Sequence, residues 1–407
     1  MSEKNWAGTH EFAASVIHNP STIDEARQLV AKADRIRPLG TRHSFNDIAD
    51  GVELISLVDV APEPSTDGET VTVTGGTKYA VVATWLEENG LALHNMGSLP
   101  HISVAGATAT ATHGSGLALG NLATAIRALE FITPTGELET VSQGDTDFAG
   151  AAVALGALGP ISRVTLAVQP SFQVRQDVFV DLDWNTLLAE TRPIFESGYS
   201  VSVFTNWADE NARIWVKTRL DQSETVPDEL FGAQREKVQI KVLEGEDNMT
   251  QQGGVPGPWS ERLPHFRIDA TPSNGDEIQT EYMVAMTDAA AALTAVRELS
   301  ARIAPVLHIT ELRTVAADDL WMSTATGRDT LCIHFTWKNL PDEVHAVIPY
   351  IEAALAPFGA RPHWGKVNFV TRFDALYEKL PDFRALVARR DPAGKFGNEH
   401  LSRLLGA

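Results

Sequence analysis

Between residues 103 and 116 the chain carries almost no large side chain, and few folds tolerate such a segment. In "SVAGATATATHGSG" every residue except Val104 and His113 is glycine, alanine, serine or threonine. These side chains cannot fill a core alone, so a neighbouring element or a bound molecule must lie against the backbone. Hydroxyls and free N–H groups suit a pyrophosphate and its polyol. The residues alone leave two interpretations open: a cofactor site, or a small-residue helix or loop packed on a sheet.

Common site patterns do not explain the glycines. The segment "GSGLALG" at 114–120 places its third glycine one residue too far for a dinucleotide fingerprint. The chain contains no G-x-x-x-x-G-K-[ST] or G-x-S-x-G motif. Its histidines lack the close spacing of metal ligands, so we expect no metal.

A second unusual segment is the loop "PLGTRHSFNDIAD" at 38–50, which follows an amphipathic helix pattern. A glycine turn needs no arginine, histidine and serine in succession. On the residues alone, His43 is compatible with a structural, a solvent-exposed or a functional role.

Composition excludes several classes of partner. The net charge of −20 provides no basic surface for nucleic acid or for an anionic membrane. The N-terminus lacks a signal-peptide pattern, and no apolar run is long enough to span a bilayer. Cys332 is the single cysteine, so no intrachain disulfide can form. We expect a soluble cytoplasmic protein, and a monomer.

At 407 residues, two domains are expected. Up to about residue 170, short helices alternate with strands: a helix capped by Ser21 or Thr22, a helix over 79–88 after a Gly75-Gly76 turn, and a hairpin turning at 134–136. Longer strand patterns and two helices follow up to about residue 375. The polar segment 243–264 reads as a loop, and the last thirty residues are helical around a break at Pro392.

Three strand-like segments of the second region carry polar side chains. In "HITELRT", Glu311 and Arg313 share one strand face, and in "CIHFTW" His334 and Thr336 do the same. In "RPHWGK", Lys366 follows His363 and Trp364. Alone, Glu311 and Arg313 could form a surface ion pair, but three such groups favour the floor of a cleft.

Seven segments together resemble the bacterial alditol oxidases of the vanillyl-alcohol-oxidase-type flavoprotein superfamily. They occur in the family's order and cover essentially the whole chain: "GTRHSFND", "NMGSLPHISVAGATATATHGSG", "ALGALGPISRVTL", "ELRTVAADDLW", "HFTW", "RPHWGK" and "DPAGKFGN". The resemblance implies an α+β fold with a two-subdomain FAD-binding domain over residues 1–170. It implies a substrate (cap) domain, an antiparallel sheet with flanking helices, over 171–375. Residues 376–407 would return to the FAD-binding domain.

The resemblance also implies the cofactor and its site. FAD would be bonded covalently to His43, because a neutral imidazole held by a rigid turn can attack the electron-poor 8α-methyl group. Arg42 stands where glycine is more usual, Thr41 where serine is, and Ala111 where glycine is common, and the role of Arg42 stays open. The residues implied to line the cofactor are Pro38, Leu39, Gly40, Thr41, Arg42, His43, Ser44, Ser98, Ser103, Gly106, Thr110, Ala111, Thr112, His113, Gly159, Ile161 and His363.

By the same resemblance, Ser98, Glu311, Arg313, Thr336 and Lys366 would bind the substrate. Every carbon of a polyol carries a hydroxyl that donates and accepts, so its pocket needs both donors and acceptors. The implied reaction oxidises a terminal primary alcohol of an alditol such as xylitol or sorbitol to the aldose, with O2 reduced to H2O2. The catalytic residues would be Glu311, Arg313 and Lys366, and the group that removes the hydroxyl proton stays open.

Gly97 is the residue from which we expect an oxidase rather than a dehydrogenase. In this superfamily a small residue at the matching position accompanies reaction with O2, which needs an open path to the flavin. A purely conformational role for Gly97 is the alternative.

Two other functions stay open: a sugar-lactone oxidase or dehydrogenase of the same superfamily, and a flavin-binding protein without activity. Retention of Glu311, Arg313 and Lys366 weighs against an inactive protein. The sequence does not rank the alditols or fix the oligomeric state.

Overall fold

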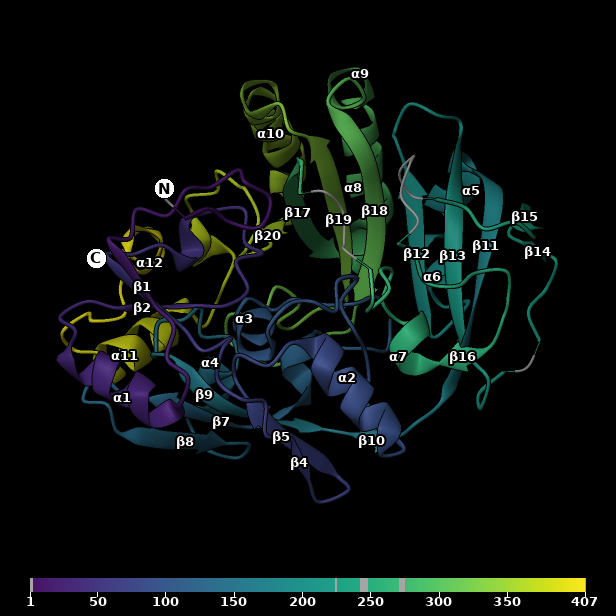
Figure 1. The fold of residues 1–407 in the computed structure, drawn as a ribbon. Coiled ribbons are helices and arrows are strands. Elements are labelled where there is room, and N and C mark those ends of the chain that lie inside the picture. Colours follow the sequence, from purple (N-terminus) through teal and green to yellow (C-terminus); the bar gives the residue numbers. More distant parts are fainter. Residues whose placement is uncertain (1–2, 224, 242–247, 271–274, 407) are drawn as a thin grey trace.

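The computed structural model describes residues 3–223, 225–241, 248–270 and 275–406, which form an α+β fold (Figure 1). In the described part of the chain, no helix is long and apolar enough to cross a membrane.

The N-terminal part contains two sheets and the helices around them. A parallel sheet has the order β1-β3-β2 and an antiparallel one the order β4-β5-β9-β7-β8. Their strands are β1 (Val16–His18), β2 (Arg37–Leu39), β3 (Glu53–Ser56), β4 (Ser65–Thr66), β5 (Thr70–Thr74), β7 (Ile126–Ile132), β8 (Leu138–Ser142) and β9 (Ile161–Ala167). Two short strands, β6 (Leu91–Ala92) and β10 (Gln169–Pro170), pair beside them. The helices are α1 (Ile23–Lys32), α2 (Tyr79–Glu88), α3 (Val104–Ala109) and α4 (Phe148–Ala151), with 3-10 turns at Asp47–Ala49 and Leu122–Ala125.

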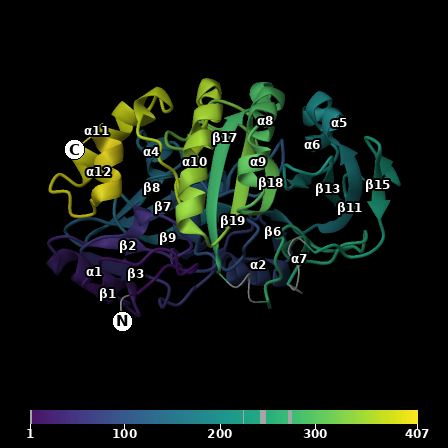
Figure 2. The same ribbon diagram turned by 90° about the horizontal axis from the view of Figure 1, so that it is seen from above.

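A ten-stranded sheet follows, in the order β14-β15-β11-β13-β12-β18-β19-β17-β20, with β16 paired to β11. Its strands are β11 (Gln173–Asp183), β12 (Ser200–Thr205), β13 (Asn211–Arg219), β14 (Glu229–Leu230), β15 (Ala233–Glu236), β16 (Gly257–Pro258), β17 (Glu277–Ala285), β18 (Leu307–Val315), β19 (Thr330–Lys338) and β20 (Arg361–Pro362). The helices of this region are α5 (Trp184–Ala189), α6 (Thr191–Phe195), α7 (Trp259–Arg262), α8 (Ala289–Arg297), α9 (Ser300–Ile303) and α10 (Pro341–Leu355). Helices α8, α9 and α10 cover the outer face of β17, β18 and β19 (Figure 2).

Along the central strands, alternate side chains point into a hydrophobic core or onto a polar face. Leu312 and Ile333 are fully buried in the core shared with the helices. Glu311 and His334 point to the opposite face, and Glu281 on β17 pairs with His334 as His334 pairs with Glu311. Three adjacent strands therefore place three titratable side chains in one row.

The secondary structure predicted from the sequence is largely confirmed. Thr22 caps α1 by accepting a hydrogen bond from the Glu25 N–H, and α2 spans the predicted residues. The predicted hairpin is β7–β8. The predicted loop 243–264 differs: residues 243–247 lie outside the described residues, and β16 and α7 form within its remainder.

The C-terminal helices α11 (Leu380–Arg390) and α12 (Glu399–Leu405) lie against the N-terminal part (Figure 1). Arg37 on β2 is 1% exposed and connects the N-terminal part to the segment between α11 and α12. Its guanidinium donates to the carbonyl oxygens of Ile48 at 2.7 Å, Phe396 at 2.8 Å and Leu155 at 2.5 Å. The predicted domain boundaries at 170 and 375 stay predictions.

Arg37→Leu is expected to lower the free energy of unfolding by at least about 3 kcal/mol, because three buried carbonyls lose their donor at about 1–3 kcal/mol each. Urea denaturation followed by tryptophan fluorescence measures the change. The exposed neighbour Arg35 is the matched control, and Arg35→Leu should stay within about 0.5 kcal/mol of wild type. Equal stability of the two variants would contradict the role of Arg37.

Candidate functional site

One cavity lies between the N-terminal part and the polar face of the large sheet. The loop 38–45, the start of α3 and the turn at 159–161 form one end. Side chains from β17, β18 and β19 and from the segment 363–366 form the other end. Segments far apart in the sequence therefore enclose a single site.

Most residues implied by the sequence lie on this cavity. Those that line it are Pro38, Leu39, Gly40, Thr41, Arg42, His43, Ser44, Gly97, Ser98, Ser103, Gly106, Thr110, Thr112, His113, Gly159, Ile161, Glu311, Arg313, Thr336, His363 and Lys366. Ala111 is the exception: it is fully buried in the hydrophobic core of the N-terminal part, with a φ of 54°. Its methyl group therefore packs away from the cavity.

Both positions where glycine is more usual, Arg42 and Ala111, have a left-handed backbone, with φ of 64° at Arg42. Only glycine adopts such a φ without steric cost, which explains the glycine preference there. The side chain of Arg42 pairs with Glu3 at 2.5 Å. Arg42 thus anchors the loop to the N-terminal segment.

His43 follows Arg42 and is held from two sides. Trp6 stacks on its ring, with centroids 5.2 Å apart, and Nδ1 lies 3.1 Å from the Thr41 hydroxyl. Burial lowers the pKa of His43 to about 4, helped by the nearby His101, so the imidazole is neutral near pH 7. Among the described residues no group bonds to its buried Nε2.

The loop also fixes the other end of the cavity. Asn46 donates to the carbonyl oxygens of Trp364 at 2.9 Å and Lys366 at 2.8 Å, and the Phe45 N–H donates to Gly365 at 2.7 Å. The segment that carries His43 therefore sets the backbone position of Lys366.

The small-residue segment fits a bulky cofactor. Gly40 and Gly106 lie side by side, and a Cβ on either would approach the Ser103 hydroxyl within 2.7 or 2.8 Å. The buried Ser103 hydroxyl itself has no partner among the described residues. An unpaired buried hydroxyl beside a glycine surface matches the pyrophosphate and ribityl groups of FAD, and the neutral imidazole of His43 matches its attachment.

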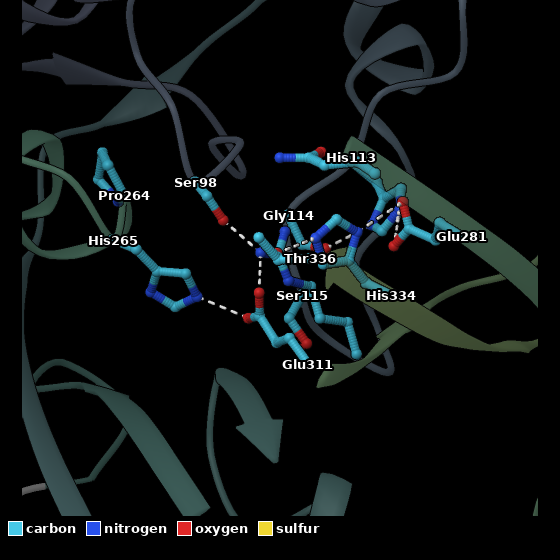
Figure 3. Close-up of polar contacts among 12 residues, drawn as sticks. Ser98, His113, Gly114, Ser115, Pro264, His265, Glu281, Glu311, His334 and Thr336 are labelled. Atoms are coloured by element: carbon cyan, nitrogen blue, oxygen red, sulfur yellow. Dashed lines mark hydrogen bonds and ion pairs between the residues drawn. The ribbon is translucent and has the colours of Figure 1, made fainter. Parts of the chain in front are cut away.

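At the substrate end, a first chain of contacts runs from Ser98 through Arg313 to Glu311 and His265. Figure 3 shows Ser98, Glu311 and His265 around this point. Arg313 donates to the Ser98 hydroxyl and to Glu311 Oε2, and His265 Nε2 lies 2.6 Å from Glu311 Oε1. Burial alone would raise the pKa of Glu311, but Arg313 and His265 outweigh it and hold that pKa well below its usual range. Glu311 is therefore an ionised acceptor.

A second chain lies on the neighbouring strands. Lys366 Nζ contacts Glu281 Oε2 at 2.6 Å and His334 Nδ1 at 2.8 Å, and His334 Nε2 lies 3.0 Å from the Thr336 hydroxyl. Burial, followed by Lys366, lowers the pKa of His334 to about 3. His334 is neutral near pH 7 and presents a proton to Thr336.

His113 completes this side of the cavity. Its Nδ1 contacts the Gly114 carbonyl at 2.7 Å and its Nε2 lies 3.3 Å from Glu281. Burial opposes its charge, but Cys332 and Glu281 raise the pKa of His113 to about 10. His113, Glu281 and Cys332 could in geometry approach one cation, yet Glu281 is already paired to His113 and Lys366, so we assign no metal.

Sequence analysis did not identify two residues that take part in these hydrogen-bonded contacts, Glu281 and His265. Glu281 had a usable signal, because Gln279 and Glu281 alternate with buried residues on β17 as Glu311 and Arg313 do on β18. No sequence signal identified His265, because it follows the polar segment 243–264, which lacks the periodicity of a helix or strand.

Two family profiles match the chain: the FAD binding domain over residues 14–142 and D-arabinono-1,4-lactone oxidase over residues 271–404. The chain is 44% identical to alditol oxidase of Streptomyces sp. (strain IKD472 / FERM P-14339) over 413 residues, which cover 98% of both chains. It is 31% identical to L-gulono-1,4-lactone dehydrogenase of Mycobacterium tuberculosis (strain ATCC 25618 / H37Rv) over 435 residues, covering 99% of this chain and 98% of that one.

Among solved structures, the chain resembles cholesterol oxidase from B. sterolicum. The TM-score is 0.80 at 16% identity, and the match covers 99% of this chain and 96% of the other. At this identity the likeness concerns the fold, and it agrees with the predicted α+β class.

Proposed function

The chain belongs to the alditol oxidase family of FAD-dependent oxidoreductases, and we propose that it oxidises the terminal primary alcohol of an alditol to the aldose while O2 is reduced to H2O2. The observation that supports this most is the pair of hydrogen-bonded chains at one end of the FAD cavity. They offer an ionised acceptor in Glu311, donors in Arg313 and Lys366, and hydroxyls in Ser98 and Thr336.

These groups suit successive hydroxyls of a polyol. An alkanol without further hydroxyls would leave buried polar groups unpaired, at about 1–3 kcal/mol each, and should be a poor substrate. A bound FAD would supply the redox chemistry: it would take a hydride from the alcohol carbon and pass the two electrons to O2, which with that hydrogen and the released hydroxyl proton gives H2O2.

The chain's own residues position the alcohol. Glu311 accepts from a substrate hydroxyl, since its two bonded donors keep it ionised. Arg313 and Lys366 stabilise negative charge that develops on the reacting oxygen. Asn46 fixes the Lys366 backbone to the His43 loop, so one rigid segment sets the distance between the cofactor end and the substrate end.

We also propose that FAD is attached covalently through His43. Its low pKa keeps a nucleophilic nitrogen free, and Trp6 and Thr41 restrict the ring. A cytoplasmic location and a monomeric state rest on the sequence and stay predictions.

A substrate panel tests the function. Xylitol, sorbitol, mannitol and glycerol are compared with L-gulono-1,4-lactone and D-arabinono-1,4-lactone by peroxide release and by anaerobic bleaching of the flavin. We expect the alditols to react fastest. Preference for a lactone would support the alternative, which the profile match over 271–404 and the mycobacterial relative favour. Bleaching by none of these compounds would support an inactive flavin-binding protein.

Gly97→Val is expected to slow reoxidation of the flavin by O2 and to leave anaerobic reduction by substrate within several-fold of wild type. Gly97 lines the cavity outside the left-handed region, and an added Cβ would meet only ordinary contacts, such as Ile102 and Thr112 at 3.8 Å. Neither backbone angle nor crowding demands glycine, which supports a role in O2 access.

Rapid mixing measures the two half-reactions of this variant separately. Gly97→Ala serves as the graded control and should show a smaller effect on reoxidation. A collapse of reduction with unchanged reoxidation would assign Gly97 a conformational role instead.

A further inference from the structure

A buried lysine that does not line the cavity is bonded to one of the side chains that does. Lys217, on β13, is 2% exposed. Its Nζ donates to the Leu263 carbonyl at 2.5 Å and to the Pro264 carbonyl at 3.4 Å, and lies 3.2 Å from His265 Nδ1. Lys217 thus lies behind the cavity wall, with His265 between it and Glu311.

His265 is enclosed on its remaining sides. The rings of Trp215 and Phe204 lie 5.4 and 5.8 Å from its imidazole, centroid to centroid. The charged groups that face it are Lys217 from β13 and Glu311 and Arg313 from β18. Its Nε2 reaches Glu311 Oε1 at 2.6 Å. Both ring nitrogens therefore have a charged partner.

We propose that Lys217 is a positioning residue for the alcohol-oxidising site: its ammonium keeps His265 neutral, with the proton on Nε2, and His265 thereby orients Glu311 as an ionised acceptor. The inference deepens the proposed function and rests on it for the consequence in catalysis.

The donors and acceptors allow only one arrangement. An ammonium group can only donate, so Nδ1 must accept from Lys217. An ionised carboxylate can only accept, so Nε2 must carry the proton that Glu311 receives. The neutral Nε2–H tautomer satisfies both bonds, whereas an imidazolium would place a proton on Nδ1 against the ammonium of Lys217.

The charge of Lys217 also favours the neutral form of His265. Burial, followed by the charge of Lys217, lowers the pKa of His265 to about 4. Burial also lowers the pKa of Lys217 to about 7, although Glu311 opposes that shift. Below pH 7 Lys217 is protonated, and it loses its proton as the pH rises, so its hold on His265 is strongest on the acid side.

The second chain repeats this arrangement across the cavity. Lys366 contacts His334 Nδ1 at 2.8 Å, and His334 Nε2 reaches Thr336. In each chain a lysine fixes the tautomer of a histidine, and the histidine directs a proton at a cavity residue. Lys366 lines the cavity itself, whereas Lys217 acts only through His265.

Nitrogen-15 NMR of histidine-labelled protein tests the tautomer directly and needs no substrate. The His265 signals are assigned as those absent from His265→Gln. We expect wild type to show Nε2–H and no titration down to about pH 5, because the pKa lies near 4. In Lys217→Met the pKa of His265 should rise by at least about one unit, since the opposing charge is gone and Nδ1 is free to accept a proton.

Kinetics then test the consequence for the reaction. The ratio of kcat/KM for xylitol in Lys217→Met to that in wild type should fall at least about twofold from about pH 7.5 to about pH 5, because a pKa raised to about 5 makes half of His265 an imidazolium there, and an imidazolium beside Glu311 weakens it as an acceptor. Lys217→Arg keeps the charge and should keep the ratio flat. In Lys217→Met/His265→Gln the amide N–H can still donate to Glu311 and does not titrate, so the dependence should disappear.

A proton on Nδ1 in wild type, or an unchanged His265 titration in Lys217→Met, would overturn the proposal. An acid limb that persists in the double variant would do the same, since it cannot come from His265. If Lys217→Met does not fold, the tautomer measured in wild type still decides the first step. Failure of wild type to oxidise any polyol, with the tautomer as expected, would count against the proposed function and not against the role of Lys217.

Discussion

Replacing His43 with alanine is expected to give a protein whose flavin is released by acid or is largely absent. In the proposed attachment the imidazole is the nucleophile, and the left-handed turn at Arg42, the Thr41 hydroxyl and the Trp6 ring hold it at the cavity. Without it no bond to the cofactor can form, and binding depends on reversible contacts alone. Acid precipitation followed by flavin fluorescence of the pellet and the supernatant measures the attached fraction.

His18→Ala is a suitable control, because His18 pairs with Glu53 on the parallel sheet and does not line the cavity. It should retain the full covalent flavin content. If denatured His43→Ala still carried flavin on the polypeptide, the attachment would have to be assigned to another residue.

Glu311→Gln and Lys366→Met should each lower kcat/KM for a polyol by at least about 100-fold, or about 2.7 kcal/mol of transition-state stabilisation. Glutamine keeps the shape of Glu311 but loses the charge that Arg313 and His265 stabilise. Methionine keeps the length of Lys366 but removes the donor to Glu281 and His334. Steady-state peroxide release, at matched flavin content, gives the ratio.

Two variants outside the cavity provide the comparison. Glu352 on α10 bonds to Tyr282, and Lys338 on β19 bonds to the Pro305 carbonyl. Glu352→Gln and Lys338→Met should retain turnover within several-fold of wild type. Near-wild-type activity of both Glu311→Gln and Lys366→Met would move the active site elsewhere.

Local signals predicted most of the secondary structure. The Thr22 cap, the Gly75-Gly76 turn and the regular alternation of β18 and β19 each depend on neighbouring residues, which a sequence displays directly. The same alternation placed Glu311 with Arg313 and His334 with Thr336 on shared faces, as observed.

Contacts across strands and loops were not predictable in this way. The row Glu281–His334–Glu311 depends on strand register, which long-range packing decides. His265 reaches Glu311 from a loop, and Lys217 reaches His265 from another strand. For Ala111 the motif was misleading. The position lies next to residues that line the cavity, but the left-handed backbone of Ala111 turns its methyl group into the core.

The contacts of the last residues also bear on protein synthesis. Phe396 accepts from Arg37, the Lys395 ammonium donates to the carbonyls of Val30 and Pro134, and Asn398 donates to the carbonyl of Asp50. On a ribosome, the strands that hold the His43 loop emerge long before these partners do. Their contacts remain incomplete, with buried donors and acceptors unpaired, until residues 395–398 have been translated. We therefore expect cofactor capture only after residues 395–398 have emerged, and we expect a nascent chain stalled before Lys395 to be a substrate for chaperones and proteases rather than a flavoprotein.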